Sequence, residues 1–217
     1  MIETGIYFDD IHSYHDLNLV LSEVDIPPAE PKTTYIDVPG ADGSVDLTEA
    51  HGEVKFSDRN CDFVFTMLPT DESTWEEKKT EVSNALNGKA CRITLDKDDE
   101  YYYEGRCNVD KYDENKKIRQ ITISARVRPY KYKLLPTKAS YTLTGGEQTL
   151  LLHNGKKPVS PFITCTSDNT IVKHNGAIYT MNAGTHKLLD IRLVDGYNSI
   201  TVAGTGTITF EYQEADL

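Results

Sequence analysis

Two histidines beside two aspartates are the residues near the start of the chain best suited to chemistry. His12 and His15 follow Asp9 and Asp10. The H-x-x-H spacing can place both imidazole rings on one side of a turn, where they could bind a zinc ion. Polar residues near the end of a strand are more often a solvated loop, so the sequence predicts no metal site here.

A second acidic cluster runs from Asp96 to Glu100 and begins like a calcium-binding loop. An EF-hand loop requires glycine at its sixth position and glutamate at its twelfth. Tyr101 and Cys107 occupy these two positions. We therefore expect an acidic turn that leads into a strand starting at Tyr101.

Three carboxylates, Asp42, Asp46 and Glu49, could in principle serve as the acid and base of a glycosidase. Their short spacing says nothing about distances across a cleft, and an aspartate before Gly43 is typical of a turn. The chain has no G-x-S-x-G motif, phosphate-binding loop or dinucleotide-binding motif. The sequence therefore predicts no catalytic or cofactor-binding residues, no cofactors, no metal ligands and no enzyme. A cysteine–histidine pair that only the fold brings together stays open.

The cysteines and tyrosines each have a structural and a functional interpretation. The cysteines form no C-x-x-C pair, which favours reduced core residues over a disulfide framework or a zinc site; they are Cys61, Cys91, Cys107 and Cys165. The tyrosine clusters at 101–103 and at Tyr130 and Tyr132 could stack on single-stranded nucleic acid. The first cluster lacks adjacent basic residues, so strand-edge packing and subunit contacts are favoured.

Charge and hydropathy exclude several classes of partner. Of the 217 residues, 38% are hydrophobic and 26% are charged, and the net charge is −11. Residues 1–133 hold 17 lysines and arginines against 27 aspartates and glutamates, whereas residues 134–217 are nearly neutral. Without a basic stripe or a basic helix, we expect neither specific nucleic-acid binding nor membrane binding. Neither a membrane span nor a signal peptide is recognisable, so we expect a cytoplasmic protein until assembly.

Most of the chain is patterned with a period of two, which is typical of β-strands. Alternating apolar residues give the segments 59–67 and 119–127 one apolar face each; these residues are Cys61, Phe63, Phe65, Met67, Ile121, Ile123, Ala125 and Val127. Two long strand-like segments flank the polar residues 113–116, which predicts a long β-hairpin.

One helix is predicted between residues 73 and 88. Ser73 as the N-cap and Glu76 three residues later match the capping-box pattern. Asn87 and Gly88 supply the signal for the C-terminal end. The stripe expected to face the core consists of Trp75, Val82 and Leu86.

A proline-rich segment and a double turn predict an extended arm. Residues 27–31, PPAEP, are too rich in proline for a central strand and indicate a stiff linker. Residues 38–48, VPGADGSVDLT, then place a Pro-Gly and an Asp-Gly turn signal almost in succession. We expect this double turn, at residues 39–43, to be the bend of the arm.

A change in composition follows residues 127–138. Beyond them the acidic residues thin out and glycine turns recur, and from Gly176 onward they are 8 to 12 residues apart. This rhythm predicts a small β-sandwich whose last strand covers residues 207–212. We therefore expect two domains, residues 1–133 and residues 134–217.

Five segments follow one another along the chain: VPGADGSVDLT (38–48), RNCDFVFTM (59–67), WEEKKTEVSNALNGK (75–89), CRITLDKDDEYYYEGRCNV (91–109) and ISARVRPYKY (123–132). In these segments and in their order, the chain resembles a known family, the distal tail proteins (Dit) of siphophages and prophages of Gram-positive bacteria. Together the segments cover essentially the first 132 residues. The remainder is similar to the family's galectin-like C-terminal sandwich.

The resemblance implies a mainly β fold and a structural role. Residues 1–133 would form a β-sandwich-like ring (belt) domain with one α-helix and an extended arm, and residues 134–217 a galectin-like β-sandwich. Six copies would form a homo-hexameric ring in the baseplate, between the tail tube and the tail-associated hub or lysin protein, and could anchor receptor-binding proteins. The protein would assemble in the host cytoplasm and end at the virion tail tip. DNA would cross the ring lumen without specific binding.

Two other functions stay open: a carbohydrate-binding module for host cell-wall glycans, and a hydrolase of the cell envelope. Sugar-binding galectins use a His-Asn-Pro-Arg stretch and a tryptophan beneath the sugar. The nearest string here is HNGKKP at residues 153–158, and the only tryptophan, Trp75, belongs to the other domain. The sequence therefore favours a sandwich without that sugar site.

Overall fold

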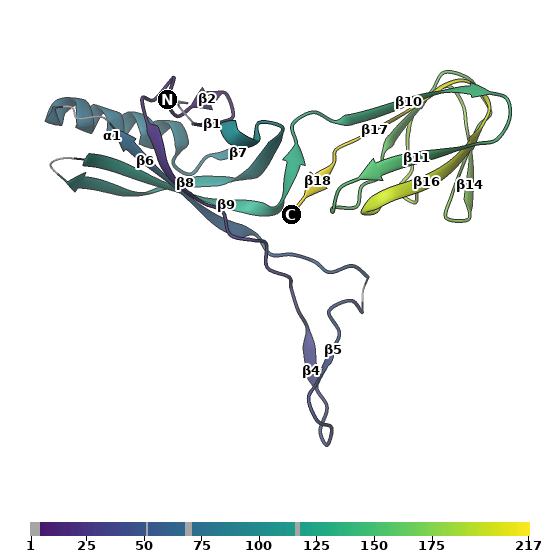
Figure 1. The fold of residues 1–217 in the computed structure, drawn as a ribbon, viewed down its shortest axis with the longest axis horizontal. Coiled ribbons are helices and arrows are strands. Elements are labelled where there is room, and N and C mark those ends of the chain that lie inside the picture. Colours follow the sequence, from purple (N-terminus) through teal and green to yellow (C-terminus); the bar gives the residue numbers. More distant parts are fainter. Residues whose placement is uncertain (1–4, 51, 68–70, 116–117) are drawn as a thin grey trace. The chain divides into compact units, whose positions relative to one another are not determined.

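The computed structural model describes residues 5–50, 52–67, 71–115 and 118–217 (Figure 1). Both parts of the chain consist mainly of antiparallel strands, so the predicted mainly β fold is confirmed. The chain divides into two compact units, Met1–Lys131 and Tyr132–Leu217. This division lies two residues before the one expected from the sequence.

The first unit is built on a sheet whose strands follow the order β2-β1-β7-β8-β9-β6-β3. These strands are β1 (Ile6–Phe8), β2 (Ile11–His12), β3 (Val20–Asp25), β6 (Arg59–Met67), β7 (Ala90–Leu95), β8 (Tyr101–Asn115) and β9 (Ile118–Lys133). The antiparallel register of β6 and β9 places Phe63 opposite Ile123. Both predicted sets of alternating apolar residues therefore lie on one face of the sheet, and all of them are buried.

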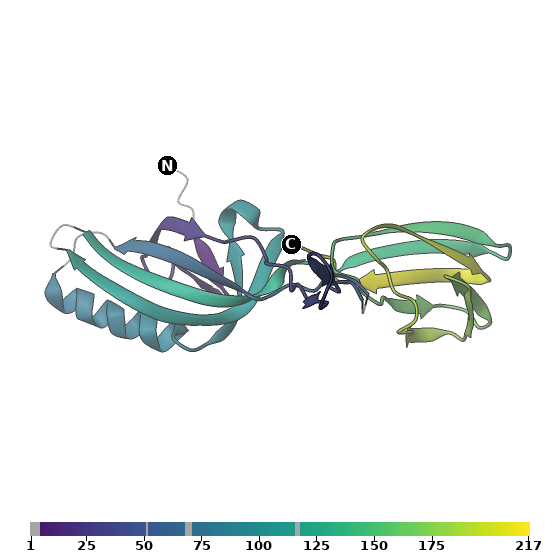
Figure 2. The same ribbon diagram turned by 90° about the horizontal axis from the view of Figure 1, so that it is seen from below.

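Helix α1 (Glu72–Leu86) covers the apolar face of this sheet (Figures 1 and 2). The predicted stripe is confirmed, because all three of its side chains are fully buried in the core with the sheet residues; they are Trp75, Val82 and Leu86. The predicted C-terminal end is also confirmed. The helix stops before Asn87, and Gly88 has a φ of +74°, a conformation that favours glycine.

The predicted N-terminal cap of the helix is wrong by two residues. Asp71, rather than Ser73, is the N-cap, and its Oδ1 accepts a hydrogen bond from the N–H of Thr74 at 2.7 Å. Aspartate caps a helix as well as serine does, and its negative charge faces the positive end of the helix dipole. Ser73 consequently lies within the first helical turn.

The long hairpin of β8 and β9 is confirmed, but its predicted polar break at 113–116 is too long. Strand β8 continues through Asn115. Near this end, the Glu114 carboxylate accepts hydrogen bonds from Trp75 Nε1 at 3.2 Å and Lys79 Nζ at 2.7 Å. These contacts hold polar residues in the strand against the helix. The rest of the predicted break lies outside the described residues.

The second unit is a sandwich of two four-stranded sheets with the orders β10-β17-β12-β15 and β11-β16-β13-β14. The first contains β10 (Thr137–Thr144), β17 (Thr205–Tyr212), β12 (Phe162–Cys165) and β15 (Gly184–Lys187). The second contains β11 (Gln148–Asn154), β16 (Gly196–Ala203), β13 (Thr170–His174) and β14 (Ala177–Met181). Side chains of both sheets, such as Ile200 and Phe210, are fully buried in one hydrophobic core.

Turn chemistry explains one of the hairpins of this sandwich. Asn175 and Gly176 connect β13 to β14 and have φ values of +47° and +82°. A two-residue turn with both φ values positive matches the twist of the strands that it joins. The predicted last strand at 207–212 lies within β17, but a short strand β18 (Ala215–Asp216) follows it.

Candidate functional site

The predicted arm is a β-hairpin that extends away from the sheet of the first unit (Figure 1). Strands β4 (Tyr35–Asp37) and β5 (Ser44–Asp46) pair antiparallel and form a two-stranded sheet of their own. Every residue from Glu30 to Leu47 is exposed. The residues of the arm therefore form no hydrophobic core within the single chain.

The two faces of the arm differ in polarity. Ile36 lies opposite Val45, and residues two apart along a strand share a face. One face is consequently apolar, with exposed fractions of 36–49%; its residues are Ile36, Val38, Val45 and Leu47. The opposite face carries Asp37, whose carboxylate accepts a hydrogen bond from the Ser44 hydroxyl at 2.5 Å.

The predicted double turn forms the tip of this hairpin. Gly40 and Gly43 have φ values of +85° and +74°, which glycine adopts without strain. The Ala41 N–H donates to the Val38 carbonyl at 3.1 Å and closes the first turn. The two turn signals thus reverse the chain between β4 and β5, where the sequence predicts a bend.

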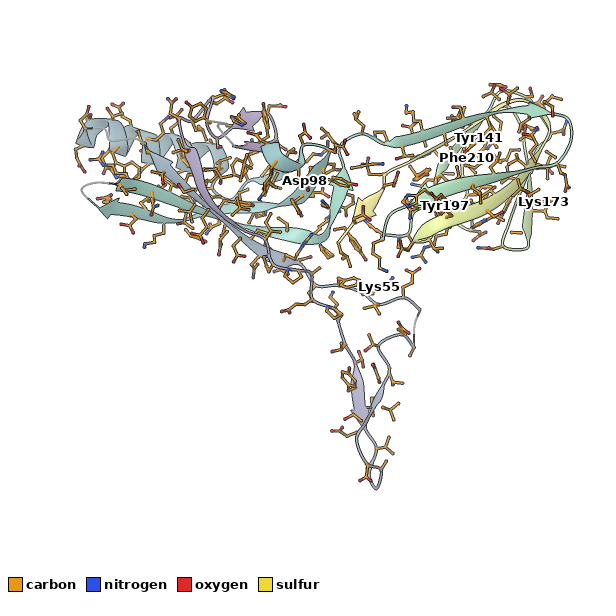
Figure 3. All side chains as sticks on the ribbon, in the orientation of Figure 1. Lys55, Asp98, Tyr141, Lys173, Tyr197 and Phe210 are labelled. Carbon is orange, nitrogen blue, oxygen red and sulfur yellow. The ribbon has the colours of Figure 1, made fainter. Side chains whose placement is uncertain are left out.

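The base of the arm, which we call the neck, holds two chain segments together. Pro31 forms an isolated bridge with Phe56. On either side of it, the Lys32 N–H donates to the Lys55 carbonyl at 2.7 Å, and the Ser57 N–H donates to Glu30 at 2.8 Å. Lys55 marks the neck in Figure 3. Proline on one segment and hydrogen bonds to the other restrict the direction in which the arm leaves the sheet.

A buried arginine follows the neck where the chain enters β6. Arg59 is 6% exposed, and its guanidinium carbon lies 5.2 Å from the centre of the Tyr103 ring. Its Nη1 donates to the Pro27 carbonyl at 3.5 Å. Arg59 therefore connects the first residue of the proline-rich linker to the sheet of the first unit.

The carboxylates considered for glycoside hydrolysis lie on the arm. Asp42, Asp46 and Glu49 are all exposed. Hydrogen bonds from the Thr48 side chain and N–H hold the pKa of Asp46 below its usual value. Because the arm is a single exposed hairpin, it does not place these groups on opposite walls of a cleft.

The candidate metal residues are engaged in local structure. His12 is buried, and its Nε2 lies 3.2 Å from Asp96 Oδ2. Its Nδ1 accepts the N–H of His15, so Nε2 carries the hydrogen and donates it to the carboxylate. Asp9 accepts the N–H of Arg92 at 2.9 Å. Within the described ranges, no three His, Cys, Asp or Glu side chains could hold a metal ion.

The predicted acidic turn after β7 is a 3₁₀ turn, η1 (Asp96–Asp98). Asp96 also accepts the N–H of Gly5 at 2.6 Å, and Asp98 pairs with Lys131 at 2.7 Å. Each carboxylate thus connects the turn to another part of the first unit.

The tyrosine cluster at the start of β8 is packed into the first unit. Tyr102 and Tyr103 are each 8% exposed. The Arg92 guanidinium lies 4.8 Å from the ring centre of Tyr102, and Lys131 Nζ lies 4.2 Å from that of Tyr101. Cations therefore cover these rings. The cluster contributes packing and does not present an open stacking surface.

A surface cavity of about 810 Å³ lies over β6, β8 and β9. Its lining arginines are engaged: Arg126 pairs with Asp58, and Arg128 with Glu104, each at 3.0 Å. Arg106 donates to a backbone carbonyl. These contacts hold the three arginines at the surface of the sheet around the cavity.

The string HNGKKP, residues 153–158, is also structural in large part. Asn154 is fully buried, and its Nδ2 donates to the carbonyls of Lys157 and Leu193. Lys157 Nζ lies 2.8 Å from the hydroxyl of Tyr132. These contacts hold the connection between β11 and β12 in place.

The apolar face of the arm is the feature that sequence reasoning missed. The signal for it is the alternation of apolar and polar residues in Tyr-Ile-Asp-Val and Ser-Val-Asp-Leu, on either side of the double turn. Each alternating stretch is only four residues long, which is too short to stand out.

Among the described residues, the one α-helix is neither long nor apolar enough to cross a membrane.

Comparisons with known proteins agree with this architecture. No protein-family model matches the chain, and no curated protein matches it in sequence. Among solved structures it is similar to SPP1 Dit, described as a paradigm of the hub adsorption apparatus in phages that infect Gram-positive bacteria. The TM-score is 0.71 over 97% of this chain and 98% of that chain, at 14% sequence identity. The resemblance drawn from the sequence is thus confirmed for the fold: this chain has the mainly β fold of Dit.

Proposed function

We propose that the protein is a structural, non-enzymatic component of a siphophage tail. Six copies form a ring at the distal end of the tail, where the ring joins the tail tube to the tail-associated hub protein and provides attachment for receptor-binding proteins. The protein assembles in the host cytoplasm and ends at the virion tail tip. The observation that carries this proposal is the arm, residues 30–47, which is wholly exposed and apolar on one face.

The arm supplies the contact that closes the ring. A hairpin of two strands is marginally stable alone in water, so β4 and β5 gain stability by packing on another chain. Burial of one Ile or Val side chain contributes about 1.5–3 kcal/mol. A closed ring requires a patch on each copy that meets a different patch on the next copy. The neck holds the arm in one direction, so the arm provides such a patch and loses less conformational entropy when it binds the next copy.

Deletion of residues 32–48 tests this role. The deletion leaves the buried cores of both units intact, because no residue from 32 to 47 is buried. We expect a folded monomer with the circular dichroism of a β protein and without rings in light scattering. Hexamers that persist after the deletion would refute the role of the arm.

The acidic first unit suggests how DNA passes such a ring. Residues 1–133 carry a net charge of −10, and six copies would bring about −60 to the ring. An acidic lumen repels phosphate groups and offers no cations for them to bind. A reconstruction of the ring with neutral or basic residues along the channel would contradict an acidic lumen. The negative charge of the first unit would then serve only solubility.

Carbohydrate binding by the second unit is the second candidate function. Tyr197 on β16 is 78% exposed and lies opposite His153 on β11, with 5.3 Å between the ring centres (Figure 3 labels Tyr197). An exposed ring with a polar tip is a surface on which a sugar can stack. If this function holds, the full chain binds cell-wall glycans on an array and Tyr197→Ala does not. Absence of binding by the unaltered chain removes this candidate.

A further inference from the structure

Two cysteines of the first unit face each other across neighbouring strands. Cys91 lies on β7 opposite Gly105 of β8, and the N–H of Cys107 donates to the Lys89 carbonyl at 2.9 Å. The two cysteines are therefore diagonal neighbours on the core face of one strand pair. Their Sγ atoms are 3.0 Å apart, and both side chains belong to the buried core.

We propose that Cys91 and Cys107 are a redox-active pair, which forms a reversible disulfide within the folded first unit when the protein meets a peroxide. The two thiols lie within one strand pair, and their oxidation does not depend on the proposed function. The pair would be a site of covalent modification, whereas the sequence predicts that all four cysteines are reduced core residues.

The distance between the sulfurs carries the proposal. A disulfide has an S–S length of about 2.05 Å, so the two sulfurs need to approach by about 1 Å. The strands are already in register, and Gly105 places no side chain opposite Cys91 that would resist this movement. Diagonal positions are wider than an unstrained disulfide prefers, and strained disulfides are the readily reduced ones. We therefore expect a bond that a dithiol reverses.

The contact also makes the two thiols unequal in reactivity. The contact between the two Sγ atoms lowers the pKa of Cys91, and the same contact together with burial raises the pKa of Cys107. The thiolate is the reactive form of cysteine, so Cys91 is the thiol that reacts first. Burial instead raises the pKa of Cys61 to about 11 and also raises the pKa of Cys165. These two cysteines are matched internal controls.

The oxidation proceeds in two balanced steps with hydrogen peroxide and begins at Cys91, which is 6% exposed, whereas Cys107 is fully buried. The Cys91 thiolate attacks one peroxide oxygen, the O–O bond breaks, and the departing hydroxide takes up the thiol proton as water. Cys107 then loses its proton and attacks the sulfenic sulfur, and the released hydroxide leaves as a second water. Two thiols are oxidised to one disulfide, and one peroxide is reduced to two waters.

The disulfide would fasten the point at which three elements of the first unit meet. The Gly88 N–H, just after helix α1, donates to the Cys107 carbonyl at 2.9 Å. Asn87 Oδ1 accepts the N–H of Val109 at 3.1 Å. The end of the helix is therefore anchored on β8 beside Cys107, and a bond to Cys91 adds β7 to this anchor.

The test treats the folded full chain with hydrogen peroxide, blocks the remaining thiols with N-ethylmaleimide under denaturing conditions, and measures the mass. We expect two blocked cysteines instead of four, a mass lower by two hydrogens before blocking, and a linked pair of peptides that contain Cys91 and Cys107. Dithiothreitol should restore all four thiols. Four blocked cysteines after peroxide, or a link that involves Cys61 or Cys165, would overturn the proposal.

Two variants keep the result interpretable. Cys61→Ser should still lose the Cys91 and Cys107 thiols together, whereas Cys91→Ser should retain Cys107 as a blockable thiol. Cys91→Ala serves the same purpose if the serine variant does not fold. Equal thiol loss in the Cys91 variants and the unaltered chain would show that the peroxide acts on another group and would refute the pair.

Discussion

At the scale of single residues, Glu214 shows how a buried charge is stabilised in the second unit. Its side chain is 8% exposed, and its carboxylate contacts Lys133 Nζ at 3.1 Å and His153 Nδ1 at 3.4 Å. The Thr137 hydroxyl also donates to it. Burial alone would raise the pKa of Glu214, but the hydrogen bonds from Thr137 and Lys133 outweigh burial and hold the pKa below its usual value.

This pKa shift predicts a pH dependence. A folded-state pKa below the unfolded value of about 4.3 means that ionised Glu214 stabilises the fold above that pH. The contribution is lost as the pH falls through the folded pKa. We expect Glu214→Gln to melt at a lower temperature than the unaltered chain at pH 7, and the difference to shrink as the pH falls below 4.

A matched control for this measurement is Glu211→Gln. Glu211 pairs with Lys138 at 3.1 Å on the surface of the same unit, with a side chain that is 41% exposed. Exposed ion pairs contribute about 0–1 kcal/mol, so this variant should melt close to the unaltered chain at every pH. A Glu214→Gln difference that stays constant down to pH 3 would contradict the assigned pKa.

The helix cap gives a second prediction at this scale. Asp71→Ala should lower the melting temperature of the first unit, because it leaves the Thr74 N–H without its acceptor. Ser73→Ala should have a smaller effect, since Ser73 is exposed within the first helical turn. Thermal unfolding followed by circular dichroism compares the melting temperatures of the two variants. A lower melting temperature for Ser73→Ala than for Asp71→Ala would indicate that Ser73 is the N-cap.

At the scale of elements, the arm carries a prediction about its two faces. Ile36→Ser with Val45→Ser removes apolar surface from the face assigned to the neighbouring copy. At about 1.5–3 kcal/mol per buried side chain, each substitution should weaken the contact about ten- to a hundredfold. We expect rings to dissociate on dilution in analytical ultracentrifugation.

The control for this prediction alters the polar face. Asp37→Asn with Asp46→Asn keeps the size of both side chains and leaves the apolar face intact. Rings should persist in this variant at the dilution that dissociates the serine variant. Equal stability of the two assemblies would show that the apolar face is not the contact.

Elements with one buried face were predictable from the sequence, because burial imposes a period that the residues display. Strands β6 and β9 and the stripe of helix α1 are examples. The start of the helix was not predictable, since Asp71 and Ser73 are both good caps. A tertiary contact favours the earlier one: Arg119 on β9 donates to the Asp71 carbonyl at 2.6 Å and pairs with Glu72 at 2.9 Å.

The candidate site was predictable only in outline. Prolines and paired glycine turns indicate an arm, because these residues restrict or reverse the backbone whatever surrounds them. The exposure of Ile36 and Val45 could not be read from the sequence, since apolar residues in strands are usually buried. The neck likewise depends on a hydrogen bond between Lys32 and Lys55, which lie far apart in the sequence.

At the scale of the whole molecule, the net charge is distributed unevenly between the two units. The first 133 residues hold nearly the entire net charge, and the exposed apolar arm belongs to the same unit. The second unit is a nearly neutral sandwich with its own core. The unit that carries the arm is therefore also the unit that carries nearly all of the net charge.

The mass of the purified protein in solution tests the central claim most directly. Light scattering after size exclusion should give six times 24.4 kDa, about 146 kDa, for the unaltered chain. Deletion of residues 32–48 should reduce the species to a single chain. A mass of one chain for the unaltered protein at every concentration would contradict the account, because the apolar face of the arm would then remain exposed without a partner copy.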